Sequence, residues 1–341
     1  MTTPHTTCTT GSQAAATGPT TPMVSVIVPN YNYARYLDLR MESILSQTFS
    51  DFEIILLDDK STDNSAQLIE KYRKHPKVTH IEINAENSGS PFHQWKKGIE
   101  LARGKYIWIA EADDFAESAF LEKTVAALEA NPEASIAFTG SIIIDENGVP
   151  SKSDWDKWHG YKSCGGRKAF DGKEYIIHNL LWKNYIYNAS MVLFRRDAYA
   201  PDMLDDSIAM RNAGDWMFWT KLASRGSVVE VYEKLNRFRR HATSTTVDGD
   251  KSGRIRLEEI AVLGYINKNF AVGSYRRRLR IGRFIKSVIK AKHYSPATRR
   301  EILDTLRREF DTGMSPYLFE RLNKTAAAIC PLLLTPHRDR L

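Results

Sequence analysis

The stretch Val24-Ser25-Val26-Ile27-Val28 predicts a buried β-strand near the start of this 341-residue chain. Pro29 and Asn30, which commonly end strands, follow it directly. Because Ser25 is the only polar residue in the run, both faces of the strand are expected to be covered. The preceding residues 1–21 are mostly Thr, Ala, Gly, Ser and Pro, so we predict that they form a disordered leader.

Apolar runs and helical spacing alternate from this strand onward. Strands are predicted at 53–57, 78–83, 106–110 and 135–139, and helices near 36–45, 66–72, 92–102 and 118–130. This alternation predicts an α/β fold with a mostly parallel, Rossmann-like sheet flanked by helices. Residues 140–190 are rich in Trp, Tyr, Lys and Gly, which indicates long loops over a site.

The chain changes character after about residue 245. A strand is predicted at 189–194 and a helix from Asp215, whereas later residues are mostly helical and basic. We therefore predict an α/β domain at 22–245 and a helical C-terminal appendage at 246–341.

Composition and charge exclude several classes of protein. Residues 271–300 hold ten basic and no acidic residues, and elsewhere acidic residues exceed basic ones by three, which argues against a nucleic-acid-binding protein. Cys8, Cys164 and Cys330 are too far apart for paired metal ligands and odd in number, which favours a reducing cytosol. No apolar run is long enough to span a bilayer, so a cytoplasmic protein is predicted.

Polar residues follow three of the predicted strands at their carboxyl ends, where parallel sheets bind ligands. They are Pro29 to Asn32, Asp58-Asp59 and Glu111-Ala112-Asp113-Asp114. Three carboxylates at one strand end repel one another unless a cation or protons intervene, and Mg²⁺ or Mn²⁺ prefers such oxygens. The alternative for the triplet of Glu111, Asp113 and Asp114 is a capping cluster for the helix at 118–130.

The other candidate residues also have two interpretations each. Asp58 and Asp59 could accept hydrogen bonds from a nucleobase or ribose, or could form a turn that leads to a cap at Ser61. Asp215 could be a general base or a helix cap. His241 could contact metal or phosphate, or could be a surface histidine.

Several common enzyme motifs do not occur. The chain has no G-x-G-x-x-G sequence, no P-loop with the required spacing, no G-x-S-x-G elbow and no H-E-x-x-H helix. A nicotinamide-binding site, a P-loop site, a serine-hydrolase elbow and a zinc-protease helix are therefore disfavoured.

Taken in order, the motifs of residues 23–245 resemble family 2 of the inverting nucleotide-sugar glycosyltransferases, which have the GT-A fold. The motifs that carry the resemblance are Val24 to Asn32, Ser43 to Thr48, Glu53 to Asp59 with Ser61-Thr62-Asp63, Asn87-Ser88-Gly89, Gly104 to Ile107 with the acidic triplet, Gly214-Asp215-Trp216 and Arg239-Arg240-His241. Two positions depart from the family pattern: Glu111 stands where Asp is common, and Gly214 stands where an acid is often found.

The resemblance implies a role for each of these residues. Pro29, Tyr31, Asp58, Asp59 and Asp113 would bind the nucleotide sugar. Glu111, Asp113, Asp114 and His241 would surround Mn²⁺ or Mg²⁺, with Asp113 the safer ligand. Asp215 would be the catalytic base. Trp155, Trp158, Trp182 and Tyr185 would form an acceptor platform, unless they are ordinary core aromatics.

The expected partners are a nucleotide-diphosphate sugar and a glycan or polyprenyl-linked acceptor, in the synthesis of a bacterial surface polysaccharide or glycolipid. Residues 275–292 place apolar side chains on one face of a basic helix, which predicts either docking on an anionic membrane at the cytosolic face or packing on the domain. The alternative functions are a sugar nucleotidyltransferase and a non-catalytic membrane-binding scaffold.

Overall fold

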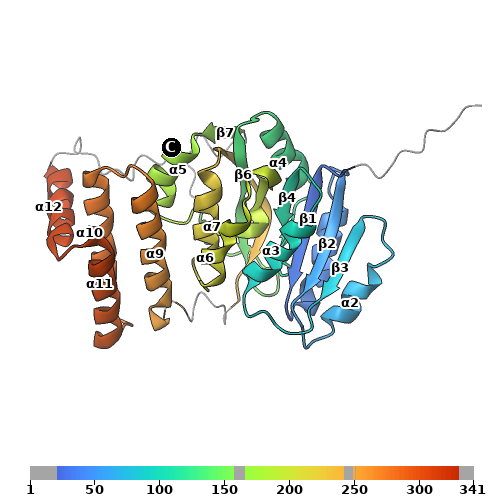
Figure 1. The fold of residues 1–341 in the computed structure, drawn as a ribbon, viewed down its shortest axis with the longest axis horizontal. Coiled ribbons are helices and arrows are strands. Elements are labelled where there is room, and N and C mark those ends of the chain that lie inside the picture. Colours follow the sequence, from blue (N-terminus) through green and yellow to red (C-terminus); the bar gives the residue numbers. More distant parts are fainter. Residues whose placement is uncertain (1–20, 157–165, 242–248, 250, 330–341) are drawn as a thin grey trace, which may run out of the picture.

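The computed structural model describes residues 21–156, 166–241, 249 and 251–329. Within them, nine strands form one sheet with helices on both faces, and four further helices stand in a row beside it (Figure 1). The strands are β1 (Val24–Asn30), β2 (Phe52–Asp58), β3 (Val78–Ile83), β4 (Tyr106–Ile109), β5 (Phe115–Ala116), β6 (Ala134–Ile144), β7 (Arg167–Phe170), β8 (Val192–Arg195) and β9 (Ser227–Arg239).

The helices fall into two groups. Those around the sheet are α1 (Ala34–Leu45), α2 (Ser65–Lys71), α3 (Pro91–Leu101), α4 (Phe120–Glu129), α5 (Gly172–Tyr175), α6 (Asp205–Ile208) and α7 (Gly214–Ala223). The C-terminal row is α9 (Arg254–Asn269), α10 (Ser274–Lys290), α11 (Pro296–Phe310) and α12 (Ser315–Ile329). Short helical turns lie at Ile176–Leu180, Ala189–Met191, Arg196–Ala198 and Pro201–Leu204.

The strand order is β3-β2-β1-β4-β8-β6-β9-β5, with β7 on β9. Strands β1 to β4 are all parallel, whereas β8 runs antiparallel between β4 and β6, and β6 pairs in parallel with β9. The predicted α/β fold class is confirmed, with the parallel part in the N-terminal half and mixed pairing beyond it.

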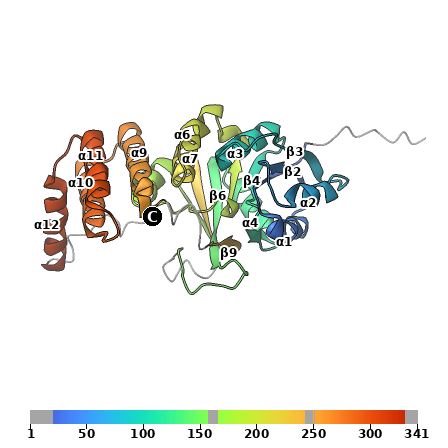
Figure 2. The ribbon, with the colours of Figure 1, turned by 90° about the horizontal axis from the view of Figure 1, so that it is seen from below.

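Strand β1 is covered on both faces, as its sequence predicts. Val26 and Val28 pack in a cluster with residues of α1 and α4, whereas Ile27 belongs to a cluster with residues of α3 and α7. Figure 2 shows α3, α6 and α7 above the sheet and α1 and α4 below it. The strand ends carry the polar clusters, and both layers hold those ends in place.

Two segments differ from the sequence predictions. The expected long loops between 140 and 190 are wrong in part, because β6 continues to Ile144 and β7 and α5 follow at 167–175. Strand β9 was not predicted, because Glu230, Glu233 and Lys234 interrupt its apolar pattern. Its length matters for the site, because its last residues run past the acidic triplet.

The C-terminal helix α10 buries most of its apolar face. Ile281, Phe284, Ile285 and Val288 are each 5% exposed or less, whereas Ile289 is 38% exposed. Most of the face that was expected to meet a membrane thus packs on the protein, which corrects the membrane-docking interpretation of residues 275–292 in favour of the packing alternative. No helix in the described ranges combines the length and the apolar character needed to cross a bilayer.

Candidate active site

The carboxyl ends of β1 and β2 are joined by a buried hydrogen-bond network around Asp58. Its Oδ1 accepts from Asn30 Nδ2 at 2.7 Å and from the Ser61 hydroxyl at 2.5 Å, and its Oδ2 accepts from the Ser61 backbone N–H at 2.9 Å. Asp58 is fully buried. This is the turn-forming role that the sequence left open. Pro29 lies within β1, and Tyr31 just beyond it is 46% exposed.

Asp59 organises the loop between β3 and α3. Its two carboxylate oxygens accept hydrogen bonds from Asn84, Asn87, Gln94 and, twice, from Ser88. The longest of these five bonds, from Asn87 Nδ2, is 3.2 Å, and the others are 2.7–3.0 Å. The carboxylate therefore fixes the shape of residues 84–90.

The acidic triplet beyond β4 is held by donors from three other elements. Glu111 Oε1 accepts from the Trp95 indole N–H at 2.8 Å. Asp114 is 1% exposed and accepts from Asn188 Nδ2 and from the Arg239 backbone N–H, both at 2.8 Å. The remaining member of the triplet, Asp113, lies within hydrogen-bond distance of the His241 imidazole.

His241 follows the end of β9 and lies beside Asp113. Pairing of β9 with β5 brings the end of β9 alongside the triplet, and His241 Nε2 lies 2.9 Å from Asp113 Oδ2. The imidazole stacks on the Tyr33 ring, with ring centroids 5.5 Å apart. Burial, reinforced by the charges of Asp113, Glu111 and Asp114, raises the pKa of Tyr33 and keeps its hydroxyl protonated.

Arg40 is a buried cation that interacts electrostatically with the acidic triplet. The sequence did not lead us to predict this role. Arg40 is fully buried, its guanidinium lies 4.8 Å from the Trp108 ring centroid, and none of its three nitrogens has a hydrogen-bond partner among the described residues. Burial lowers the pKa of Arg40 to about 10, although the acidic triplet opposes this. Arg40 is thus a permanent positive charge under the site.

The pKa values of two triplet carboxyls are far above their usual range. Burial, with the neighbouring charge of Asp113 as the second cause, raises the pKa of Glu111 to about 8 and that of Asp114 to about 7. Near neutral pH these two carboxyls therefore hold protons for much of the time, unless a nearby cation favours their charged forms.

These raised pKa values predict how stability depends on pH. The folded, metal-free protein holds protons on Glu111 and Asp114 that the unfolded chain releases near pH 4, so the stability they contribute is complete below pH 4 and is lost as pH rises through 7 to 8. We expect the melting temperature to fall by several degrees between pH 5 and pH 8.5 in a chelator, measured by circular dichroism. Glu111→Gln should flatten this decline, and an equally steep decline in that variant would contradict the assignment.

Asp215 opens α7 and is partly exposed. Its Oδ2 accepts from Asn184 Nδ2 at 3.0 Å and its Oδ1 from the Trp216 backbone N–H at 2.7 Å. Burial raises the pKa of Asp215 to about 6. Such a carboxyl is ionised at neutral pH yet more basic than an ordinary aspartate, which suits a general base.

One helix, α3, links the acidic points. Within one turn, Gln94 donates to Asp59 and Trp95 donates to Glu111. The Phe92 ring lies against Gly214, the residue before Asp215, because a Cβ built on Gly214 would approach Phe92 Cε2 to 2.4 Å. The 92–95 turn spans about 5 Å along the helix axis. Asp59, the triplet and the start of α7 therefore lie around a single helix end.

The close contact at Gly214 gives a testable prediction. In Gly214→Ala the new methyl group would meet the Phe92 ring and would lie 2.8 Å from the Ser207 backbone oxygen. We expect a loss of about 1–3 kcal/mol in the free energy of unfolding, together with reduced turnover because Asp215 moves with the helix start. Gly313→Ala is the control, since nothing lies within 4 Å of its added Cβ. Equal stability of the two variants would contradict the packing argument.

The aromatic residues expected to bind an acceptor make different contacts in the described part of the chain. Trp182 packs against the core and carries the Arg283 guanidinium 5.1 Å from its ring centroid, as the core interpretation holds. Trp155 packs edge-on against Tyr187, one residue before the Asn188 that bonds Asp114. Tyr185 lies next to Asn184, and Trp158 lies outside the described residues.

Asp113 and His241 fit a divalent cation. They offer a carboxylate oxygen and an imidazole nitrogen at adjacent positions, and ions such as Mg²⁺ bind through one or two protein ligands plus substrate phosphates. Within the described ranges no group of three or more His, Cys, Asp or Glu residues is arranged to hold a metal ion. Glu111 and Asp114 are instead engaged by Trp95, Asn188 and the backbone of Arg239.

Sequence reasoning missed most residues that hold the acids. Trp95 was assigned to an apolar helix face, which hid its indole N–H, and Asn184 and Asn188 stand in a segment without a recognisable pattern. Arg40 could have been identified from the sequence, since it lies on the apolar side of the predicted helix with Leu37, Met41 and Ile44.

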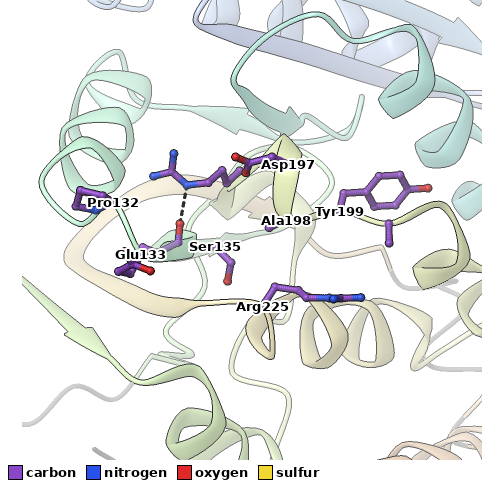
Figure 3. Close-up of a pocket in the computed structure, with 10 residues that line it drawn as sticks. Pro132, Glu133, Ser135, Asp197, Ala198, Tyr199 and Arg225 are labelled. Atoms are coloured by element: carbon purple, nitrogen blue, oxygen red, sulfur yellow. Dashed lines mark hydrogen bonds between the residues drawn. The ribbon is translucent and has the colours of Figure 1, made fainter.

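A separate depression of about 350 Å³ lies at the opposite end of the strands, near Pro132 to Ser135, Tyr199 and Arg225 (Figure 3). Arg195, which lines it, pairs with Tyr106 at the amino end of β4, whereas the triplet follows the carboxyl end. This depression is therefore not part of the candidate site.

The chain belongs to glycosyl transferase family 2, because the model of that family matches residues 25–200, just over half of the chain. It is therefore a glycosyltransferase. An uncharacterized glycosyltransferase of Haemophilus influenzae is 29% identical over 262 residues, which are 72% of this chain and 75% of the relative. The Bacillus subtilis protein TuaG, named for teichuronic acid biosynthesis, is 35% identical over 131 residues, which are 38% of this chain and half of TuaG.

Solved structures show the same fold. S. aureus TarS 1–349, in a crystal structure with UDP-GlcNAc, superposes with a TM-score of 0.61 at 18% identity, over 83% of this chain and 80% of that one. The GT-A-type fold implied by the sequence resemblance is confirmed.

Proposed function

We propose that this protein is an inverting glycosyltransferase that moves a sugar from a nucleotide-diphosphate donor to a hydroxyl of a glycan or lipid-linked acceptor. The observation that carries the proposal is the arrangement around α3, where Asp215, with its raised pKa, stands on the same rim as the acidic triplet. One base together with one cation-binding group is what a single displacement requires.

The donor would lie across the carboxyl ends of β1, β2 and β4. We assign its base and ribose to Tyr31, Pro29 and the Asp59 network, where a base N–H could replace the 3.2 Å bond from Asn87. Asp58 supports this network from within the turn. Asp113 and His241 would hold Mn²⁺ or Mg²⁺ beside the diphosphate, with Asp114 and Glu111 behind them. When bound, the ion stabilises the charge that develops on the leaving phosphate.

Asp215 would take the proton of the acceptor hydroxyl as that oxygen attacks the anomeric carbon. The bond to the leaving phosphate breaks in the same displacement, so the configuration inverts and no covalent sugar intermediate forms. The Asn184 amide, which donates to Asp215 Oδ2, orients the carboxylate for this transfer.

The acceptor and pathway are proposed from relatives. TuaG is named for teichuronic acid biosynthesis and the TarS structure holds UDP-GlcNAc, so we propose a role in bacterial surface polysaccharide or glycolipid synthesis at the cytosolic face of the membrane. We propose Trp155, which packs on Tyr187 next to Asn188, and Tyr185, which adjoins Asn184, as the aromatic residues that contact an acceptor.

The proposal is tested by screening nucleotide sugars for thermal stabilisation with and without Mn²⁺. A true donor at 100 times its Kd should stabilise the folded state by about 2.7 kcal/mol, and the same donor should support transfer to a glycan acceptor with an inverted anomeric product by NMR. A retained configuration, or no stabilisation by any nucleotide sugar, would overturn the proposal.

A further inference from the structure

The outer face of α12 exposes large apolar side chains. Leu318 and Leu322, one helical turn apart, are 59% and 71% exposed, and Met314 just before the helix is 36% exposed. We call these three residues the α12 ridge. Opposite them, Glu320 is buried and paired with Lys286 of α10 at 2.6 Å, so α12 packs through its other side. Figure 1 shows α12 as the outermost helix of the C-terminal row.

Exposed apolar residues concentrate at this end of the molecule. Leu322 and Leu318 are the two most exposed of the nine large hydrophobic residues exposed in the described part of the chain, and Tyr275 of the adjoining α10, at 41%, joins them. Its ring packs edge-on against Phe319 of α12. A cluster of this kind marks an interaction surface more often than scattered single residues do.

Basic side chains flank the ridge. Arg321 and Lys324 are exposed on α12, and the guanidinium of Arg278 on α10 lies 4.7 Å from the Phe319 ring centroid, on the other side of Leu318 and Leu322. The single acid of α12 is Glu320, which is buried. The exposed side of this helix is therefore apolar along its middle and positive along its edges.

We propose that the α12 ridge docks this enzyme on an anionic lipid surface, with Leu318 and Leu322 inserted among the acyl chains and Arg278, Arg321 and Lys324 at the headgroups. Lys and Arg side chains near such a surface each contribute favourably, and the apolar residues add buried area. A second copy of the chain is a poorer occupant, because a symmetric contact through the ridge would bring these cations against their own copies.

The position of the ridge relative to the active site agrees with this occupant. In α10, Arg280 donates to the Leu181 carbonyl at 2.7 Å and Arg283 covers the Trp182 ring. Two residues further along, Asn184 holds Asp215. Helix α10, on which α12 packs, thus contacts the segment that positions the base. Docking at the ridge would hold the enzyme on the same membrane as a lipid-linked acceptor. This last step rests on the proposed function.

Vesicle flotation of the full chain tests the proposal. With vesicles of phosphatidylcholine and phosphatidylglycerol at low salt we expect binding that weakens as salt rises, and much weaker binding to phosphatidylcholine alone. The double variant Leu318→Ser/Leu322→Ser should bind at least about tenfold more weakly, and Arg321→Glu/Lys324→Glu about thirtyfold or more. The matched control is Leu39→Ser. Leu39 is 41% exposed on α1, at the other end of the molecule from α12 (Figure 2), so this variant should bind vesicles as the parent does.

Three outcomes would overturn the proposal: no binding to anionic vesicles, equal binding of both double variants and the parent, or a dimer in the parent that Leu318→Ser/Leu322→Ser dissociates. Melting temperatures within about 2 °C of the parent would show that the variants are folded. Flotation needs neither donor nor turnover, so its failure is distinct from failure of the transfer assay with a water-soluble acceptor, which tests the proposed function.

Discussion

Asp215→Asn is expected to reduce sugar transfer by a factor of about 10²–10⁴ or more while donor binding survives. A positioned general base contributes a factor of this size, and an asparagine retains the shape and the contact with Asn184 but cannot take a proton. The measurement is turnover at saturating donor, together with donor affinity by calorimetry. A large fall in turnover with an unchanged Kd identifies the base.

The matched control for this experiment is Asp205→Asn. Asp205 lies near the same helix but pairs with Lys96 at the surface, 60% exposed, where such pairs contribute little. It should retain full activity and stability. If Asp215→Asn transferred sugar at close to the parent rate, the proposed mechanism would be wrong, and a non-catalytic scaffold would become the better account.

Asp113→Asn is expected to lose metal-dependent donor binding. Asp113 faces His241 directly, and an amide is a much weaker ligand for a hard cation than a carboxylate. We expect the donor Kd in Mn²⁺ to rise at least tenfold and to approach the value measured in a chelator, with turnover falling by two or more orders of magnitude. Calorimetry in Mn²⁺ and in chelator gives both numbers.

Glu111→Gln separates a ligand from a supporting residue. Because Glu111 accepts a hydrogen bond from Trp95 and is not paired with His241, a glutamine can keep that contact. The variant should retain most of the Mn²⁺ effect on donor binding. Greater loss in Glu111→Gln than in Asp113→Asn would show that the ion sits on the other side of the triplet.

The sequence was enough to predict the parallel half of the fold. In β1 to β4 the strands are continuous apolar runs and the helices between them have clear spacing, so local pattern and burial agree. Beyond β4, local pattern and burial no longer agree. Strand β6 continues through Gly140 and Ser141, where its pairing with β9 shifts register. Strand β9 carries several charged residues although it is paired on both sides. Insertion of β8 in antiparallel sense is a long-range pairing that no local pattern encodes.

For the site, the acids could be found but their supports could not. Asp59, Asp113 and Asp215 stand at strand and helix ends, where composition and position single them out. Gln94 bonds Asp59, Trp95 bonds Glu111 and Asn188 bonds Asp114, across 35, 16 and 74 residues of sequence. Only the folded chain brings these partners together. Asp58 and Asp59 are neighbours in sequence but have different partners in space. Asp58 accepts from Ser61 within its own turn, whereas Asp59 accepts from Ser88 of another loop.

Helix α3 couples the positions of three acidic groups: Asp59, the acidic triplet and Asp215. The turn at 92–95 contacts Asp59 through Gln94, Glu111 through Trp95 and Gly214 through Phe92, which are the proposed nucleotide, cation and base sides of the rim. A substitution that tilts this turn should therefore change donor affinity, metal dependence and turnover together. Kinetic defects that arrive together in a variant would point to the helix, whereas a defect in one parameter alone would point to the individual carboxylate.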